Sequence, residues 1–134
     1  SVADIDKDRV TKTTQKFGLT AVDPEAIVTS DCDVFAPCAL GAVVNDQTLP
    51  KMKCKIVAGG ANNQLAEQRH GDALMELGIL YAPDYVINAG GLMNVFVELE
   101  GYSRERAFEK TTQVYDNLMQ VYRIAKEEKI ANHR

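Results

Sequence analysis

Residues 55–64, KIVAGGANNQ, decide the fold of this chain. The first four have the composition of a buried strand, and the small residues Gly59, Gly60 and Ala61 follow directly. Asn62 and Asn63 then offer side-chain amides that can cap a helix. A buried strand that leads through small residues into a helix is the repeating unit of a parallel sheet. Because ligands of open α/β sheets bind beside the carboxyl ends of the strands, we expect the functional residues at positions of this kind.

Short apolar runs alternate with amphipathic segments along the rest of the chain. The expected strands span residues 2–5, 19–22, 34–36, 55–58, 79–81 and 85–87. Helices are expected at 8–17 and 64–77, because Gly18 and Gly78 suit the left-handed position after a helix end. A long C-terminal helix is expected over 103–128, with Ser103 as its N-cap. An apolar stripe along this helix predicts a docking face, either on its own domain or on another subunit, and consists of Ala107, Thr111, Val114, Leu118, Val121 and Ala125.

These elements predict one domain over residues 1–134, with a Rossmann-like, doubly wound and mostly parallel sheet. The glycine pairs at 59–60 and 90–91 lack the third glycine of a GxGxxG motif. We therefore expect a sheet without its first strand and without the glycine-rich loop. Such a sheet would have a central gap, so either the chain is a fragment or a partner supplies the strand.

Composition narrows the function classes. The chain has 134 residues, 46% of them hydrophobic, and a net charge of -4 with acids and bases interspersed. This distribution argues against a nucleic-acid partner, and no apolar run is long enough to span a membrane. The N-terminus lacks the features of a secretory signal. The cytoplasm is the expected location.

The cysteines and histidines predict neither a disulfide framework nor a metal site. Cys32, Cys38 and Cys54 are odd in number and lack CxxC spacing, so we expect small, buried or half-buried thiols. His70 and His133 lie in polar sequence, which predicts surface positions for both.

Asp4 ends the first expected strand, just before a helix that begins at residue 7 or 8. In a dinucleotide-binding fold a carboxylate at this position accepts hydrogen bonds from the adenosine ribose and repels a 2′-phosphate, which favours NAD over NADP. The alternative is an ordinary acid at a strand end.

Two further strand ends offer small residues or amides. Residues 35–42, FAPCALGA, turn through Pro37 into small residues, where the backbone could approach a flat ligand or pack on a neighbouring loop. Residues 81–91, YAPDYVINAGG, place Asn88 before a glycine pair. Asn62 offers a donor and an acceptor that suit a nicotinamide ribose or carboxamide, although helix capping would explain one of the two neighbouring asparagines. Together the three strand ends predict a nucleotide cleft.

The segments FAPCALGA (35–42), AGGANNQL (58–65) and GILYAPDYVINAGGLMNV (78–95) occur in an order and spacing that resemble the Glu/Leu/Phe/Val dehydrogenase family. ELEGYSRERA (98–107) strengthens the resemblance to its leucine dehydrogenase members. The resemblance covers nearly the whole chain.

This resemblance implies roles for ten residues. Asp4 and Ile5 would flank the adenosine ribose, and Cys38 and Ala39 would lie over the cofactor. Gly60, Ala61 and Asn62 would contact the nicotinamide side, and Asn88 would complete the cofactor cleft. Leu92 and Val95 would line the substrate side-chain pocket.

The resemblance also implies reversible, NAD-dependent oxidative deamination of an L-amino acid to a 2-oxo acid and ammonia, in a homo-oligomer. The aliphatic pocket residues favour a branched-chain substrate. The catalytic lysine pair of the family belongs to a separate N-terminal domain, and no lysine here lies in a Gly-rich stretch, so no catalytic residue is assigned. We expect this chain alone to be inactive and to bind NAD weakly or not at all. The alternatives are a non-catalytic nucleotide-binding or assembly module, or another nicotinamide oxidoreductase on the same fold.

Overall fold

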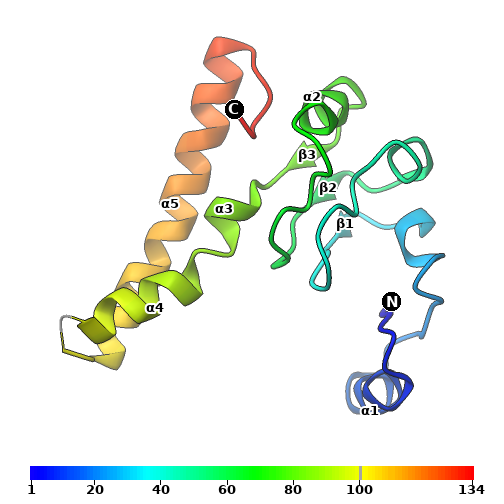
Figure 1. Ribbon diagram of the computed structural model, residues 1–134, viewed down its shortest axis with the longest axis horizontal. Helices are drawn as coiled ribbons and strands as arrows, with labels where there is room; N and C mark the ends of the chain where they lie inside the picture. Colours follow the sequence, from blue (N-terminus) through cyan, green and yellow to red (C-terminus); the bar gives the residue numbers. More distant parts are fainter. Residues whose placement is uncertain (100) are drawn as a thin grey trace.

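The computed structural model describes residues 1–99 and 101–134. Its centre is a parallel sheet of three short strands in the order β1 (Val34–Phe35), β2 (Ile56–Val57) and β3 (Leu80–Tyr81) (Figure 1). Val34 pairs with Ile56, which pairs in turn with Leu80. The parallel arrangement requires a crossover between successive strands, and α2 (Arg69–Glu76) lies in the crossover from β2 to β3. The predicted α/β class is confirmed.

The remaining elements flank this sheet. They are α1 (Lys7–Phe17), η1 (Ile27–Thr29), η2 (Leu49–Lys51), α3 (Asp84–Ile87), α4 (Gly90–Leu99) and α5 (Arg104–Glu128).

The core lies between β1–β3 and the segments that cross between them. Val57 of β2 and Leu74 of α2 are fully buried, as is Val44 in the first crossover. Phe35 and Tyr81 flank them on the neighbouring strands. Each strand is two residues long, and its second residue is the buried one.

Helix boundaries follow the capping residues that the sequence offers. Gly18 adopts the left-handed conformation (φ 64°) after α1, and Gly78 does so (φ 72°) after α2. The Ser103 hydroxyl accepts a hydrogen bond from the Arg106 backbone N–H at the start of α5. These predicted helix ends are confirmed.

The apolar stripe of α5 packs within the chain. Ala107 and Ala125 are buried, and the four residues between them in the stripe are half-buried. Helices α3 and α4 contact α5, and Figure 1 shows α4 lying along the first part of the long helix. Packing on its own domain therefore buries the two ends of the stripe and covers part of its middle. The segment ELEGYSRERA joins α4 to α5 and includes Glu100, which lies outside the described residues.

The N-terminal strand expected at 2–5 is reduced to one parallel bridge between Val2 and Ala21, and this bridge lies outside the three-stranded sheet. The Val2 N–H donates to the Thr20 carbonyl (3.0 Å), and the Val22 N–H donates to the Val2 carbonyl (2.9 Å).

Several expectations are wrong. Residues 85–87, expected as a strand, belong to helix α3, because Asp84 follows Pro83 and the backbone N–H groups of Val86 and Ile87 bond the Pro83 carbonyl. Helix α2 begins at Arg69 and not at residue 64, since Leu65 is extended and forms a parallel bridge with Val44 in the segment between β1 and β2. Gly90–Leu99 forms a helix where none was expected.

The expected environments of three side chains are also wrong. His70 is buried (2% exposed) and the side chain of His133 is 7% exposed, because each packs against other parts of the chain. Cys38 is exposed in the loop after β1, while Cys54 is buried and Cys32 half-buried as expected. Among the described residues, no helix is long and apolar enough to cross a bilayer.

Candidate functional site

The loops that follow β1 and β2 are bonded to each other through their backbones. The Ala61 N–H donates to the Pro37 carbonyl (3.0 Å), and the Ala42 N–H donates to the Asn63 carbonyl (2.7 Å). Ala42 and Asn63 both have positive φ (59° and 51°), which turns each loop back on itself. The carboxyl ends of the two strands therefore form one joined surface.

The glycines of this surface have different reasons to be glycine. A Cβ on Gly59 would lie 2.1 Å from the Pro37 carbonyl oxygen, and a Cβ on Gly41 would lie 2.6 Å from the Asn62 carbonyl oxygen. Close packing of one loop on the other thus explains Gly41 and Gly59. Gly60 is exposed and meets nothing closer than the Cys38 sulfur at 4.0 Å, so neither packing nor a positive φ requires glycine there.

Asp84 attaches the end of β3 to the same surface. Its carboxylate accepts a hydrogen bond from the Asn63 backbone N–H and another from the Tyr81 hydroxyl (3.3 Å). Burial is the main cause of a raised pKa for Tyr81, and the Asp84 charge adds to it, so the phenol stays protonated as a donor.

The side chains of Asn62 and Asn88 meet across this junction. The Asn88 Nδ2 group donates to Asn62 Oδ1, so an exposed loop after β2 contacts the residue that ends α3. Neither Asn62 nor Asn63 caps a helix, because the N-cap of α2 is Gln68. Helix capping, the alternative explanation for one of them, therefore applies to neither.

Gln64 is a residue of the site that the sequence patterns do not single out. Its side chain is fully buried, and its Nε2 donates to the carbonyls of Gly59 (2.5 Å) and Ala61 (3.0 Å). Its Oε1 has no hydrogen-bond partner among the described residues. Gln64 thereby braces the turn that presents Gly60. A buried amide cannot be told from a surface one by sequence alone, and the local pattern predicts only the start of a helix at this position.

Asp4 and Ile5 form part of a separate groove with Val22 and Pro24, next to the start of α1. The Asp4 carboxylate accepts from the Asp6 backbone N–H (2.9 Å) and from Arg9 Nη1 (3.0 Å). The Asp6 N–H is the main cause of a lowered pKa for Asp4, and Arg9 contributes, so the group is charged at neutral pH. Ile5 is 91% exposed.

The other predicted site residues are distributed around the joined loops. Cys38 and Ala39 lie exposed in the loop after β1. Ala61 is buried, and its backbone N–H and carbonyl are bonded to Pro37 and Gln64. Leu92 and Val95 lie one turn apart on α4 and are both exposed (75% and 51%).

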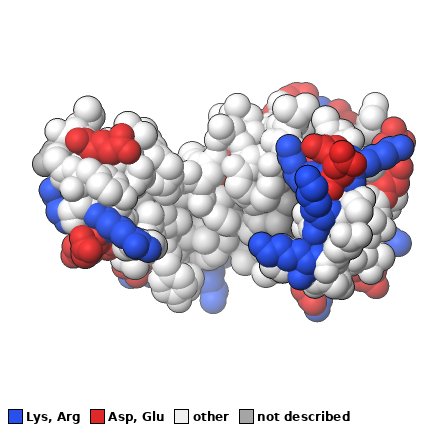
Figure 2. Space-filling model, turned by 90° about the horizontal axis from the view of Figure 1, so that it is seen from below, with Lys and Arg blue, Asp and Glu red and all other residues white. Residues whose placement is uncertain are grey.

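Seen from below, the molecule narrows between the lobe of α4 and the start of α5 and the lobe that carries α1 (Figure 2). Most of the surface at this waist is uncharged. In Figure 1 the loops after β1 and β2 lie between the same two parts of the molecule.

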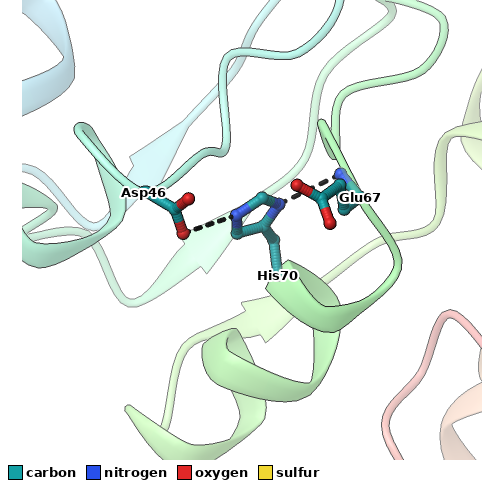
Figure 3. A group of neighbouring side chains, drawn as sticks. All are labelled: Asp46, Glu67 and His70. Atoms are coloured by element: carbon teal, nitrogen blue, oxygen red, sulfur yellow. Dashed lines mark hydrogen bonds and ion pairs between the residues drawn. The ribbon is translucent and has the colours of Figure 1, made fainter.

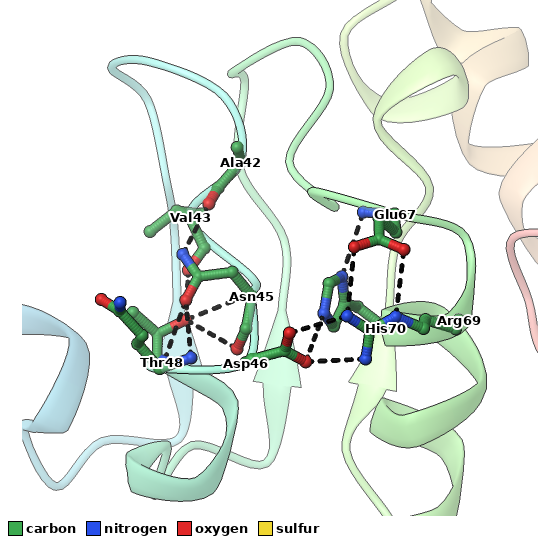
Figure 4. A network of polar contacts seen from close by, with 9 residues as sticks. Ala42, Val43, Asn45, Asp46, Thr48, Glu67, Arg69 and His70 are labelled. Atoms are coloured by element: carbon green, nitrogen blue, oxygen red, sulfur yellow. Dashed lines mark hydrogen bonds and ion pairs between the residues drawn. The ribbon is translucent and has the colours of Figure 1, made fainter.

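A second polar cluster connects the first crossover to the start of α2. It consists of Asp46, Glu67 and His70 (Figure 3) together with Arg69. Arg69 bonds both Asp46 oxygens (2.7 Å each) and both Glu67 oxygens (3.0 and 3.1 Å) (Figure 4). The His70 Nδ1 accepts from the Glu67 backbone N–H (3.0 Å), which leaves Nε2 protonated as the donor to Asp46 (3.1 Å). Since both imidazole nitrogens and both carboxylates are already bonded, we assign this cluster a structural role and no metal.

The Asp46 carboxyl in this cluster has its pKa lowered to about 2, first by the hydrogen bonds from Arg69 and then by that from His70.

Residues 2–132 match the family model described as Glutamate/Leucine/Phenylalanine/Valine dehydrogenase. The leucine dehydrogenase of Geobacillus stearothermophilus is 55% identical over 132 residues, which are 98% of this chain and 36% of that protein. The phenylalanine dehydrogenase of Thermoactinomyces intermedius is 46% identical over 131 residues, which are 96% of this chain and 36% of that protein. The chain thus spans about a third of the length of these relatives.

Solved structures agree with the sequence comparison. The L-tryptophan dehydrogenase of Nostoc punctiforme superposes with a TM-score of 0.96 at 47% identity, over 98% of this chain and 40% of that one. A hetero-hexameric glutamate dehydrogenase of Thermus thermophilus has a TM-score of 0.68 at 20% identity, over 96% of this chain and 33% of that one, and so shares the fold. This chain belongs to the Glutamate/Leucine/Phenylalanine/Valine dehydrogenase family.

Proposed function

We propose that residues 1–134 form the NAD-binding domain of an amino-acid dehydrogenase that oxidatively deaminates a branched-chain L-amino acid, with leucine as the reference substrate. One observation supports this most: the loops after β1, β2 and β3 are bonded into a single surface at the carboxyl edge of the sheet. This edge is where open α/β sheets bind ligands.

The residues at this edge fit the nicotinamide end of NAD. Gly60 leaves open space above the backbone that internal packing does not use. Within the described part of the chain, Asn62 Nδ2 and Asn88 Oδ1 have no hydrogen-bond partner, so the pair offers one donor and one acceptor. A carboxamide or ribose hydroxyl can bond to such a pair. Cys38 and Ala39 would border the same space.

The Asp4 groove fits the adenosine ribose. Each Asp4 oxygen accepts one hydrogen bond in the structure, and a carboxylate oxygen can accept a second from a ribose hydroxyl. Its negative charge disfavours a 2′-phosphate, although Arg9 beside it reduces that repulsion. A comparison of NAD with NADP therefore tests this assignment directly.

In the proposed reaction, bound NAD supplies the hydride acceptor. The residues of this chain bind and orient it: Asp4 holds one end, and Asn62 and Asn88 hold the other. None is assigned a proton-transfer step. We propose that the general base and the group that binds the substrate carboxylate belong to a separate N-terminal catalytic domain of the same protein.

Leu92 and Val95 are proposed to form one wall of the substrate side-chain pocket. Both are aliphatic and exposed on α4, immediately after the loop that carries Asn88. An aliphatic wall favours leucine or valine over a polar side chain. Two relatives are named L-tryptophan dehydrogenase and phenylalanine dehydrogenase. Comparing aromatic with branched-chain substrates therefore tests the proposed specificity.

The test is an assay of the full-length protein for NADH formation with leucine, valine, phenylalanine, tryptophan and glutamate, each with NAD and with NADP. We expect turnover with NAD that is fastest with leucine or valine. Absence of turnover with all five substrates, together with absence of NADH binding, would support a non-catalytic assembly module instead.

A further inference from the structure

The long helix α5 carries an exposed row of apolar side chains next to the stripe that packs within the chain. Phe108, Tyr115 and Tyr122 recur every seven residues, and Met119 lies between the last two on the same side of the helix. Phe108 is 60% exposed, Tyr115 68% and Met119 48%. In Figure 1, α5 forms one flank of the molecule, with the sheet on its other side. Packing within the described chain therefore does not account for this row.

The row continues into a groove at the C-terminal end of α5. Tyr122 and Lys126 form one wall of this groove, and Met75 of α2 and Leu80 of β3 lie on its other walls. The groove has a volume of about 580 Å³, which can hold an aromatic side chain. Aromatic residues that fill pockets of this kind are the usual anchors of protein interfaces.

The charges beside the row have opposite signs at its two ends. Glu109 follows Phe108 and Arg123 follows Tyr122, so both lie along the same edge of the row. Both side chains are exposed, and neither forms an ion pair with another described residue. If two copies of α5 packed antiparallel, Glu109 of each copy would lie opposite Arg123 of the other. A parallel arrangement would instead bring like charges together.

We propose that this row is the contact face for a second copy of the chain, with the two α5 helices packed antiparallel about a two-fold axis. Each face is then both donor and recipient, as a two-fold interface requires. Tyr115 of each copy would lie beside Met119 of the other, and Phe108 would face the groove of the other. The inference goes beyond the proposed function and does not depend on the coenzyme site.

The available surface is large enough for a specific contact. The exposed parts of Phe108, Tyr115 and Met119 from two copies would bury roughly 700 Å². The flanking polar residues would raise the total to roughly 1,000 Å² or more, the lower limit for a specific interface.

The experiment measures the mass of the full-length protein by sedimentation equilibrium over a range of concentrations. Tyr115→Glu puts a charge at the centre of the proposed contact, so the dissociation constant should rise roughly a hundredfold and the mass of the assembly should halve at micromolar protein. The matched control is Asn117→Glu, which adds the same charge on the opposite side of α5 and should leave the mass unchanged.

Charge reversal tests the antiparallel arrangement. Glu109→Arg and Arg123→Glu should each weaken the association roughly tenfold, and the double variant should return it to within about threefold of wild type. Asp116 lies midway between the two positions, so it would meet its own copy near the axis. Asp116→Asn should therefore tighten the association by about threefold.

Thermal denaturation of each variant distinguishes loss of the contact from loss of the fold. If Tyr115→Glu lowers the melting temperature but leaves the mass unchanged, the row is covered by another part of the same chain and the inference is wrong. A double charge-reversal variant no better than the single variants would also overturn it. A monomeric wild-type protein would do the same while leaving the proposed function intact, because NADH binding is measured separately.

Discussion

Gly59 and Gly60 are adjacent in sequence, and the structure predicts opposite consequences for replacing them. An alanine Cβ at position 59 would lie 2.1 Å from the Pro37 carbonyl oxygen and 2.4 Å from the Pro37 nitrogen. Both are backbone atoms, so no side-chain rotation relieves the contact. At position 60 the nearest atom would be the Cys38 sulfur at 4.0 Å, which leaves room for a methyl group.

The magnitudes follow from these distances. Gly59→Ala must move one loop by about an ångström, which costs about 1–3 kcal/mol as overpacking. The displacement also breaks the bond from the Ala61 N–H to the Pro37 carbonyl, which adds about 1–3 kcal/mol. The melting temperature should fall by roughly 10 °C. Gly60→Ala should change the free energy of unfolding by no more than about 0.5 kcal/mol.

A larger side chain at position 60 should weaken coenzyme binding without lowering stability. Gly60→Val places a branched side chain in the space proposed for the nicotinamide, so NADH affinity should fall about tenfold or more while the protein stays as stable as wild type. Thermal denaturation and NADH fluorescence titration of the full-length protein measure the two effects separately. Normal NADH binding by Gly60→Val would refute the placement of the coenzyme, and an unchanged melting temperature for Gly59→Ala would refute the loop contact.

Three further changes test other parts of the account. The Asp46 pKa is about 2 in the folded protein against an ordinary value of 3.8. The stability that the charged carboxylate contributes is therefore fully present above the unfolded pKa and is lost as the pH falls through about 2. Asp46→Asn should lower the urea midpoint near neutral pH and change it little near pH 2. Val95→Ala should enlarge the proposed pocket and shift kcat/KM from leucine towards phenylalanine by about tenfold, and an unchanged ratio would place Val95 outside the pocket. The exposed Cys38 thiol should react with a maleimide several-fold more slowly when NADH is bound, whereas buried Cys54 should react slowly in both states, as mass spectrometry of the labelled protein can establish.

Sequence patterns predicted the fold class because each βα unit is recognisable from a short, continuous stretch of sequence. The strands at 34–36, 55–58 and 79–81 are apolar and end in residues that break a strand, and each contains one of the observed strands. Helix ends were predictable where a single residue supplies the cap, as Gly18 and Ser103 do.

The errors arise where a neighbouring turn or a tertiary contact overrides the preference of the segment itself. Residues 85–87 have strand composition, yet Pro83 and Asp84 start a helical turn there. His70 lies in polar sequence but is buried, because Asp46, distant in sequence, and the Glu67 backbone bond both of its nitrogens.

The sequence predicted where the candidate site lies, but not the hydrogen bonds within it. Asn62 and Asn88 were selected because both were expected to follow strands; Asn88 follows helix α3 instead, yet it still lies beside Asn62. Their mutual hydrogen bond and the roles of Asp84 and Gln64 depend on how the segments after β2 and β3 lie relative to each other in space. No local sequence pattern encodes that arrangement.

The central claim is that the carboxyl edge of this sheet is a coenzyme cleft, and the most direct test is a structure of the full-length protein with NADH. We predict that the adenosine ribose lies against Asp4 and that the nicotinamide lies over Gly60, with Asn62 Nδ2 as a donor. Binding of NADH at any other surface of the protein would contradict the account.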